Sequence, residues 1–133
     1  MRSSNHVLVW VAVLLMVIVG LARAAGGVTL MVTGKTSLPE SEASSSTMAM
    51  IGLFLVLIGI AEIVAAIGVA MRKRRFWTLG IVATVAFVLD GAINGYLLFG
   101  RPGDGGTVVN AVVAAGIIAS LLRTRPRASS DVR

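Results

Sequence analysis

Four long apolar runs occupy most of the chain, and short polar stretches separate them. A run of about 20 apolar residues is long enough to cross the hydrocarbon core of a bilayer as an α-helix. The pattern therefore predicts four transmembrane helices, at about residues 7–32, 47–71, 76–99 and 107–122. The last run is short at one end, so we expect helix tilt or local thinning of the bilayer to accommodate it.

The loops between these runs are too short to fold separately, so residues 1–133 are predicted to form one integral membrane domain. The expected fold class is all-α, a four-helix transmembrane bundle. The first outer loop, "GKTSLPESEASSS", is polar and rich in serine, which is typical of a flexible linker.

The composition agrees with a membrane protein and excludes several other classes. Hydrophobic residues make up 56% of the chain and charged residues only 14%, whereas soluble domains have about 25% charged residues. So few charges cannot cover the surface of a small water-soluble domain. There is no cysteine and only one histidine, His6, which excludes disulfides, thiolate sites and a multi-histidine metal site within this chain. We expect no metal and no cofactor.

The basic residues lie beside the apolar runs rather than along one face. The N-terminal segment contains Arg2, and the middle loop and the C-terminal segment are rich in arginine, whereas the other two loops contain only Lys35 and Arg101 as basic residues. By the positive-inside rule, the basic segments face the cytoplasm, which predicts a multi-pass inner-membrane protein with both termini inside. This placement explains the net charge of +6, so the expected partner is the lipid bilayer and not nucleic acid. The basic residues on this side are Arg2, Arg72, Lys73, Arg74, Arg75, Arg123, Arg125 and Arg127.

The first helix has a second interpretation. Arg2, an apolar stretch and "ARA" at 22–24 are also typical of a secretory signal with its cleavage site. Cleavage after Ala24 would leave three spans. The sequence "AAGGVTLMV" stays apolar beyond that site, where a mature external segment should turn polar. This favours an uncleaved helix, and both interpretations remain open.

Three aromatic residues mark the expected membrane boundaries. Trp10, Trp77 and Tyr96 lie near the ends of the apolar runs. Aromatic rings with a polar group favour the head-group region, so we expect these three side chains at the two membrane surfaces.

Five polar side chains fall at membrane depth. At 1.5 Å per residue from the inner helix ends, Glu62 lies about 14 Å deep, Asn110 about 18 Å, Asp90 about 21 Å, Arg23 about 24 Å and Asn94 about 27 Å. An ionised side chain at the centre of a helix costs about 2.5–3.5 kcal/mol on insertion scales. We therefore expect these groups to face the bundle interior or water, not lipid.

Small residues on the same helices predict close packing. Gly91 and Gly95 form a GxxxG pattern, which permits close approach of a neighbouring helix. Gly52, Gly59 and Ala66 recur at seven-residue spacing on the second helix. A compact bundle with its polar groups turned inward is the expected result.

The polar cluster has a structural and a functional interpretation. In the first, Arg23 pairs with Asp90 or with Glu62 and, together with hydrogen bonds from the asparagines, fixes the register of the helices. In the second, two acids share one base, so one carboxyl has no countercharge and the low-dielectric interior favours its neutral, protonated form. Such a carboxyl can transfer protons, bind a cation or contact a quinol. The sequence does not say which acid pairs with Arg23.

Two families resemble parts of this chain. The segments "GIAEIVAAIGVAMRKRRFWTLGIV" and "GLARAAGGVTLMVTG" resemble small bacterial four-helix membrane proteins grouped as DoxX-like, with an arginine-rich cytoplasmic turn between apolar helices. That resemblance implies a four-helix fold and, for some members, association with membrane-bound sulfur or quinone redox complexes. It leads us to expect an accessory or structural subunit of a membrane assembly, with a partner protein or a second copy of the chain.

The second resemblance supports an alternative function. The segment "IAEIVAAIGVAM" looks like the first helix of small multidrug resistance transporters, with its membrane-embedded glutamate, and "LLFGRPGD" is similar to the turn before their last helix. This implies a proton-coupled exporter of small molecules. The glutamate lies in the second span here, and that family's pocket aromatics are absent. No nucleophile–base pair is visible, so we expect no catalytic residues.

Overall fold

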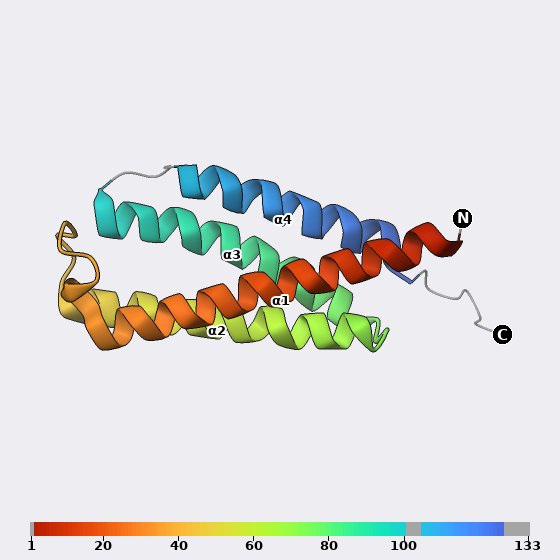
Figure 1. Cartoon of the computed structure of the whole chain (residues 1–133), viewed down its shortest axis with the longest axis horizontal. Helices are drawn as coiled ribbons and strands as arrows, with labels where there is room; N and C mark the ends of the chain where they lie inside the picture. The colour runs from red at the N-terminus through yellow and green to blue at the C-terminus, as the bar shows by residue number, and fades with distance from the viewer. Residues whose placement is uncertain (1, 101–104, 127–133) are drawn as a thin grey trace.

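The computed structural model describes residues 2–100 and 105–126, and within them the chain is all-helical. The four predicted spans are confirmed, since four helices are long and apolar enough to cross a membrane. Their bounds lie within a few residues of the predicted ones (Figure 1). The elements are α1 (Arg2–Thr33), the short 3₁₀-helix η1 (Gly34–Thr36), α2 (Ser45–Ala70), α3 (Arg75–Phe99) and α4 (Gly105–Thr124).

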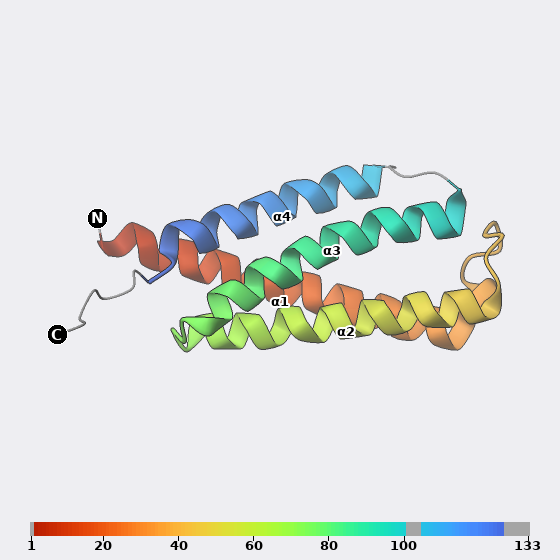
Figure 2. The same cartoon turned by 180° about the vertical axis from the view of Figure 1, so that it is seen from behind.

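The helices run alternately up and down around the bundle. Each helix packs against the next one in the chain, and α4 packs against α1, so α1 and α3 are diagonal neighbours. The start of α1, the α2–α3 turn and the end of α4 lie at one end, which we call the basic end; η1 lies at the other, the loop end (Figures 1 and 2). This arrangement agrees with the predicted topology, whereas the membrane side that each end faces stays a prediction.

The fourth helix is longer than its apolar run indicated. Its 20 residues span about 30 Å at 1.5 Å per residue, which equals the thickness of a typical hydrocarbon core. The helix continues to Thr124 at the basic end, so the expected thinning of the bilayer is not required.

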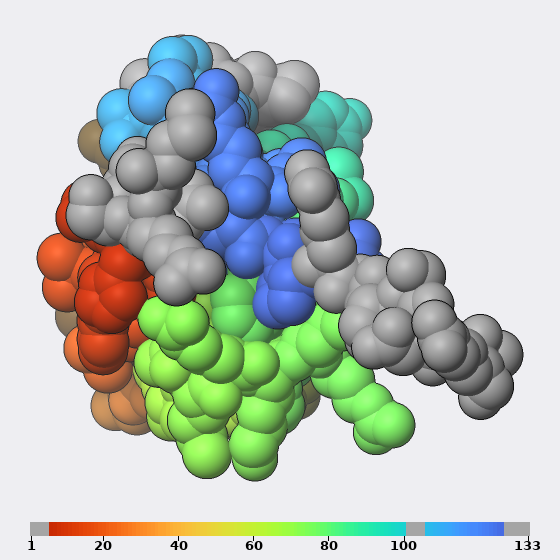
Figure 3. All heavy atoms as spheres, turned by 90° about the vertical axis from the view of Figure 1, so that its right-hand side faces the viewer, coloured from red at the N-terminus to blue at the C-terminus, as the bar shows by residue number. Residues whose placement is uncertain are grey.

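An apolar core fills the basic end of the bundle, where α1, α4 and the α2–α3 turn come together (Figure 3). Trp77, from the start of α3, belongs to this core and is only 2% exposed. Its indole Nε1 donates to Thr124 Oγ1 at 3.3 Å, which joins α3 to the end of α4. Trp77 therefore lies near the end of its helix, as predicted, with its ring buried in the bundle core. Trp10 and Tyr96 are exposed, as expected.

The loop between α1 and α2 folds back over the loop end. Ser41 and Ala43 are buried, and Leu38 packs against a second apolar cluster that includes Leu30 and Met48. This part of the loop therefore differs from the flexible linker that its composition predicted. Apolar side chains at two positions were enough to hold it against the helix ends.

Glycines bring the backbones of α1 and α2 together at two levels. A Cβ atom on Gly20 would lie 2.7 Å from the carbonyl oxygen of Gly59, and one on Gly27 would lie 2.5 Å from that of Gly52. Both pairs use the seven-residue spacing that was predicted for α2, and Gly59 takes part in helix packing as predicted. We call these two pairs the glycine contact.

The basic turn between α2 and α3 also ends α2. Arg72 adopts the left-handed conformation, with φ of 56°. The Arg72 amide donates to the Val69 carbonyl at 2.9 Å, and the Lys73 amide donates to the Gly68 carbonyl at 3.0 Å. These two bonds form a Schellman motif, in which glycine is the usual left-handed residue. Arg72, Lys73, Arg74 and Arg75 are all exposed.

Candidate functional site

An ion pair crosses the interior of the bundle between α1 and α3. Arg23 Nη1 donates to Asp90 Oδ2 at 3.0 Å. Arg23 Nη2 donates to the backbone carbonyl of Phe87 at 3.4 Å, and the guanidinium lies 4.4 Å from the centroid of the Phe87 ring. Of the two pairings that the sequence left open, the structure therefore has Arg23 with Asp90.

Asn94 completes the surroundings of Asp90. Its Nδ2 donates to Asp90 Oδ2 at 2.9 Å, from the next turn of α3. One carboxylate oxygen thus accepts from a guanidinium and an amide, and bonds to an ionised acceptor are stronger than neutral ones. The side chains of Arg23 and Asp90 are 15% and 11% exposed.

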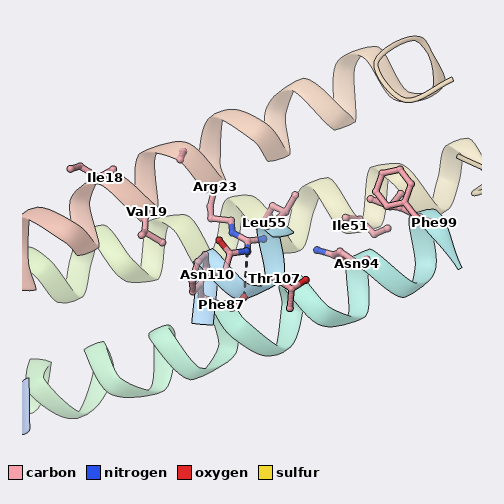
Figure 4. A pocket seen from close by; sticks show the side chains of 15 residues that line it. Ile18, Val19, Arg23, Ile51, Leu55, Phe87, Asn94, Phe99, Thr107 and Asn110 are labelled. Atoms are coloured by element: carbon pink, nitrogen blue, oxygen red, sulfur yellow. Dashed lines mark hydrogen bonds between the residues drawn. The ribbon is translucent and has the colours of Figure 1, made fainter. Parts of the chain in front are cut away.

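Gly91 provides the space for this arrangement. A Cβ atom on Gly91 would lie 3.1 Å from Arg23 Nη2 and 3.4 Å from Asn110 Nδ2. The neighbours of Gly91 are therefore two polar side chains, whereas the GxxxG pattern predicted the backbone of another helix. Gly95 lines the same space. Asn110, from α4, is half-buried and lies beside Arg23 (Figure 4).

A cavity of about 430 Å³ lies next to the ion pair, and we call it the central cleft. Residues from all four helices line it, and Arg23, Asn94 and Asn110 project between the helices around it (Figure 4). Its other lining residues are mostly apolar. They include Ile18, Val19, Ala22, Ile51, Leu55, Phe87, Leu98 and Phe99.

A second cavity, of about 460 Å³, lies between α2 and α3, and we call it the lateral groove. Its walls are almost entirely apolar, and Asp90 and Asn94 are its polar members at membrane depth. Asn94 lines both cavities, whereas Arg23 lines the central cleft and Asp90 the lateral groove. The two partners of the ion pair therefore border two different cavities.

Glu62 lies apart from this cluster, in the packed interior. It is 0% exposed, and its Cβ is 3.3 Å from the position that a Cβ on Gly20 would take. Thr84 of α3 is also 0% exposed. The Thr84 hydroxyl lies near enough to interact with the Glu62 carboxyl, but the geometry leaves Thr84 Oγ1 and both Glu62 oxygens without a hydrogen bond among the described residues.

The sequence prediction missed two residues of these sites. Phe87 contacts Arg23 through its ring and its carbonyl, and nothing in the sequence distinguishes it from other apolar residues. Thr84 had a detectable signal: counted from Arg75 it lies about 14 Å deep, at the level expected for Glu62. Within the described residues, no group of three or more histidine, cysteine, aspartate or glutamate side chains is placed to hold a metal ion.

Comparisons with protein-family models, with curated proteins and with solved structures found no match for this chain. The resemblance to DoxX-like proteins and the one to small multidrug resistance transporters therefore rest on the sequence segments alone.

Proposed function

We propose that this protein holds an amphipathic small molecule in the central cleft, as a non-enzymatic accessory subunit of a larger membrane assembly. The polar part of the molecule would lie against Arg23, Asn94 and Asn110, and its apolar part along the remaining walls. The observation that supports this most is the cleft itself, which four helices line beside a part-buried ion pair.

The size and lining of the cleft fit this function. Ligand sites in proteins measure about 300–1,000 Å³ and combine mostly apolar walls with a few polar groups, and the cleft has about 430 Å³. An ion pair that served only to fix helix register would be expected in an interior packed without large voids. Here the pair borders open space on two sides instead.

A cleft-filling substitution with a matched control tests the proposal. Ala22 and Ala25 lie about one turn apart on the same helix and are both exposed, but Ala22 lines the cleft and Ala25 does not. We expect solvent extracts of the purified wild type and of Ala25→Leu to contain the same small molecule by mass spectrometry, and extracts of Ala22→Leu to lack it. Equal amounts in both variants, or no bound molecule in the wild type, would refute cleft binding.

The assembly part of the proposal has a separate test. The outward faces of all four helices are apolar, and they can contact lipid or the helices of a partner. We expect a second protein, or a second copy of this chain, to co-purify in a mild detergent. A monomer that purifies alone from its native membrane would contradict the accessory role and leave the cleft proposal standing.

A proton-coupled exporter is the second candidate, and the position of Glu62 is the observation that favours it. Asp90 is already paired with Arg23, so Glu62 is the carboxyl that would exchange protons for substrate. In proteoliposomes, Glu62→Gln should abolish proton-linked flux while the bundle stays assembled. The absence of any flux with the wild type, across a panel of lipophilic cations, would exclude this candidate.

A further inference from the structure

The surroundings of Glu62 do not suit a carboxylate ion. The side chain is completely buried, and neither of its oxygens has a hydrogen-bond partner among the described residues. An isolated charge at such a position becomes neutral rather than staying ionised, because the interior cannot replace its hydration. The Thr84 hydroxyl is also buried, interacts with the Glu62 carboxyl and has no hydrogen bond among the described residues. The two groups are therefore a hydroxyl donor and a carboxyl acceptor that both lack a partner.

Within residues 2–100 and 105–126, no ion pair involves Glu62. The charged residues inside the four predicted spans are Arg23, Glu62 and Asp90. Arg23 of α1 donates to the Asp90 carboxylate and to the Phe87 carbonyl, both on α3. On α4, residues 105–122 contain no charged side chain. The base that could neutralise Glu62 is therefore already used by the other acid.

The packing of α1 closes one side of the site. Gly20 lies over the Cβ of Glu62, and a Cβ on Gly20 would also come within 2.7 Å of the Gly59 carbonyl. The backbones of α1 and α2 are thus in direct contact at the level where the Glu62 side chain begins. This contact leaves no room there for a longer α1 side chain that could approach the carboxyl.

We propose that Glu62 is a proton-binding site, occupied as a neutral carboxylic acid and hydrogen-bonded to the hydroxyl of Thr84. The ligand is the proton itself. The site is separate from the central cleft and does not depend on the molecule proposed there. The exporter candidate would need such a site, but the site remains if the protein transports nothing.

Infrared spectroscopy of the full-length chain in lipid bilayers tests the protonation state directly, because a neutral carboxylic acid and a carboxylate have separate C=O bands. At neutral pH, we expect a carboxylic acid band in the wild type that Glu62→Gln removes and Asp90→Asn keeps. Thr84→Val should shift this band, because the acid loses its hydrogen-bond partner, while Thr78→Val at an exposed α3 position should not. A spectrum without any Glu62-dependent acid band would overturn the proposal.

An apolar carbodiimide gives an independent chemical test. The carboxyl oxygen of a protonated acid adds to the central carbon of the reagent, and its proton moves to a reagent nitrogen. The acyl group then migrates from oxygen to nitrogen, so the chain gains the mass of one whole reagent with no leaving group. We expect one adduct per wild-type chain, mapped to Glu62 by peptide mass spectrometry, and one in Asp90→Asn but none in Glu62→Gln.

Two outcomes would contradict a proton site. Labelling of Asp90 in place of Glu62 would show that the wrong acid was assigned as neutral. Protection of Glu62 by Na⁺ at constant pH, without protection by a large organic cation at equal ionic strength, would show a metal-cation site instead. Circular dichroism and gel filtration of Glu62→Gln confirm that the loss of the band or adduct is not a loss of fold.

Discussion

Two adjacent glycines of α1 allow a sharp test of the packing. A Cβ atom on Gly27 would lie 2.5 Å from the carbonyl oxygen of Gly52 and 2.9 Å from side-chain atoms of Leu55 and Val56. A Cβ atom on Gly26 would meet nothing within 4 Å. Gly27→Ala and Gly26→Ala therefore add the same methyl group at neighbouring positions, one inside the glycine contact and one outside it.

The magnitude follows from the distances. To bring the closest approach at Gly27 from 2.5 Å to the 3.4 Å of ordinary contact, α1 and α2 must separate locally by about 0.9 Å. The obstacle is a backbone carbonyl, which cannot rotate away as a side chain can. Overpacking of this kind costs about 1–3 kcal/mol. Replacing glycine by alanine inside a helix gains about 0.5–1 kcal/mol at either position, so the difference between the two variants isolates the packing cost.

Reversible unfolding in mixed detergent micelles, followed by circular dichroism, measures both free energies of unfolding. We expect Gly26→Ala to equal or exceed the wild type, and Gly27→Ala to be less stable than Gly26→Ala by about 1–3 kcal/mol. Equal stability of the two variants would refute the close backbone contact between α1 and α2.

Three further predictions concern the ion pair, the basic turn and the topology. Arg23→Leu should destabilise the bundle more than the double variant with Asp90→Leu, with a coupling energy of about 1–3 kcal/mol, because the single change leaves a part-buried acid unpaired; a double-mutant cycle in the same assay with no coupling would contradict this. Arg72→Gly should raise the free energy of unfolding by about 1 kcal/mol, because Arg72 holds a left-handed conformation that glycine adopts without strain; a lower thermal midpoint would contradict it. The chain has no cysteine, so Lys73→Cys should react with an impermeant maleimide only after the cells are permeabilised, whereas Ser46→Cys should react in intact cells; the reverse pattern would invert the predicted topology.

The helices could be predicted from the sequence because a bilayer allows few solutions. A run of about 20 apolar residues must satisfy all its backbone groups internally, and the helix does so. The ends of the helices were less certain because local bonds set them: Ser44 caps α2 by accepting from the Thr47 amide at 3.1 Å, and α4 continues past its apolar run to Thr124. A hydropathy pattern contains no information on helix capping or on the continuation of a helix beyond its apolar run.

The pairing of the polar groups was only partly contained in the sequence. Counted depth brought Arg23, Asp90 and Glu62 into the same part of the membrane, but it left both pairings of Arg23 open, and the structure has Arg23 with Asp90. Depth does not give the direction in which a side chain points. The contact of Arg23 on α1 with Asp90 on α3, the helix diagonally opposite, could therefore not be derived. The burial of Trp77 could not be derived for a related reason, since it depends on the end of α4, 47 residues away.

The two acids of the interior are in opposite environments, and this contrast separates a structural role from a protonation role. Asp90 has a countercharge and an amide donor, and it borders a cavity. Asp90→Asn therefore leaves the Arg23 cation unpaired. Because the ion pair is partly exposed, we expect this variant to lose up to about 3 kcal/mol of unfolding free energy. Glu62 has neither partner, and if it is already neutral, Glu62→Gln replaces one uncharged group by another of the same shape. We therefore expect Glu62→Gln to unfold within about 1 kcal/mol of the wild type. A large loss of stability in Glu62→Gln would instead contradict a neutral Glu62 in the native bundle.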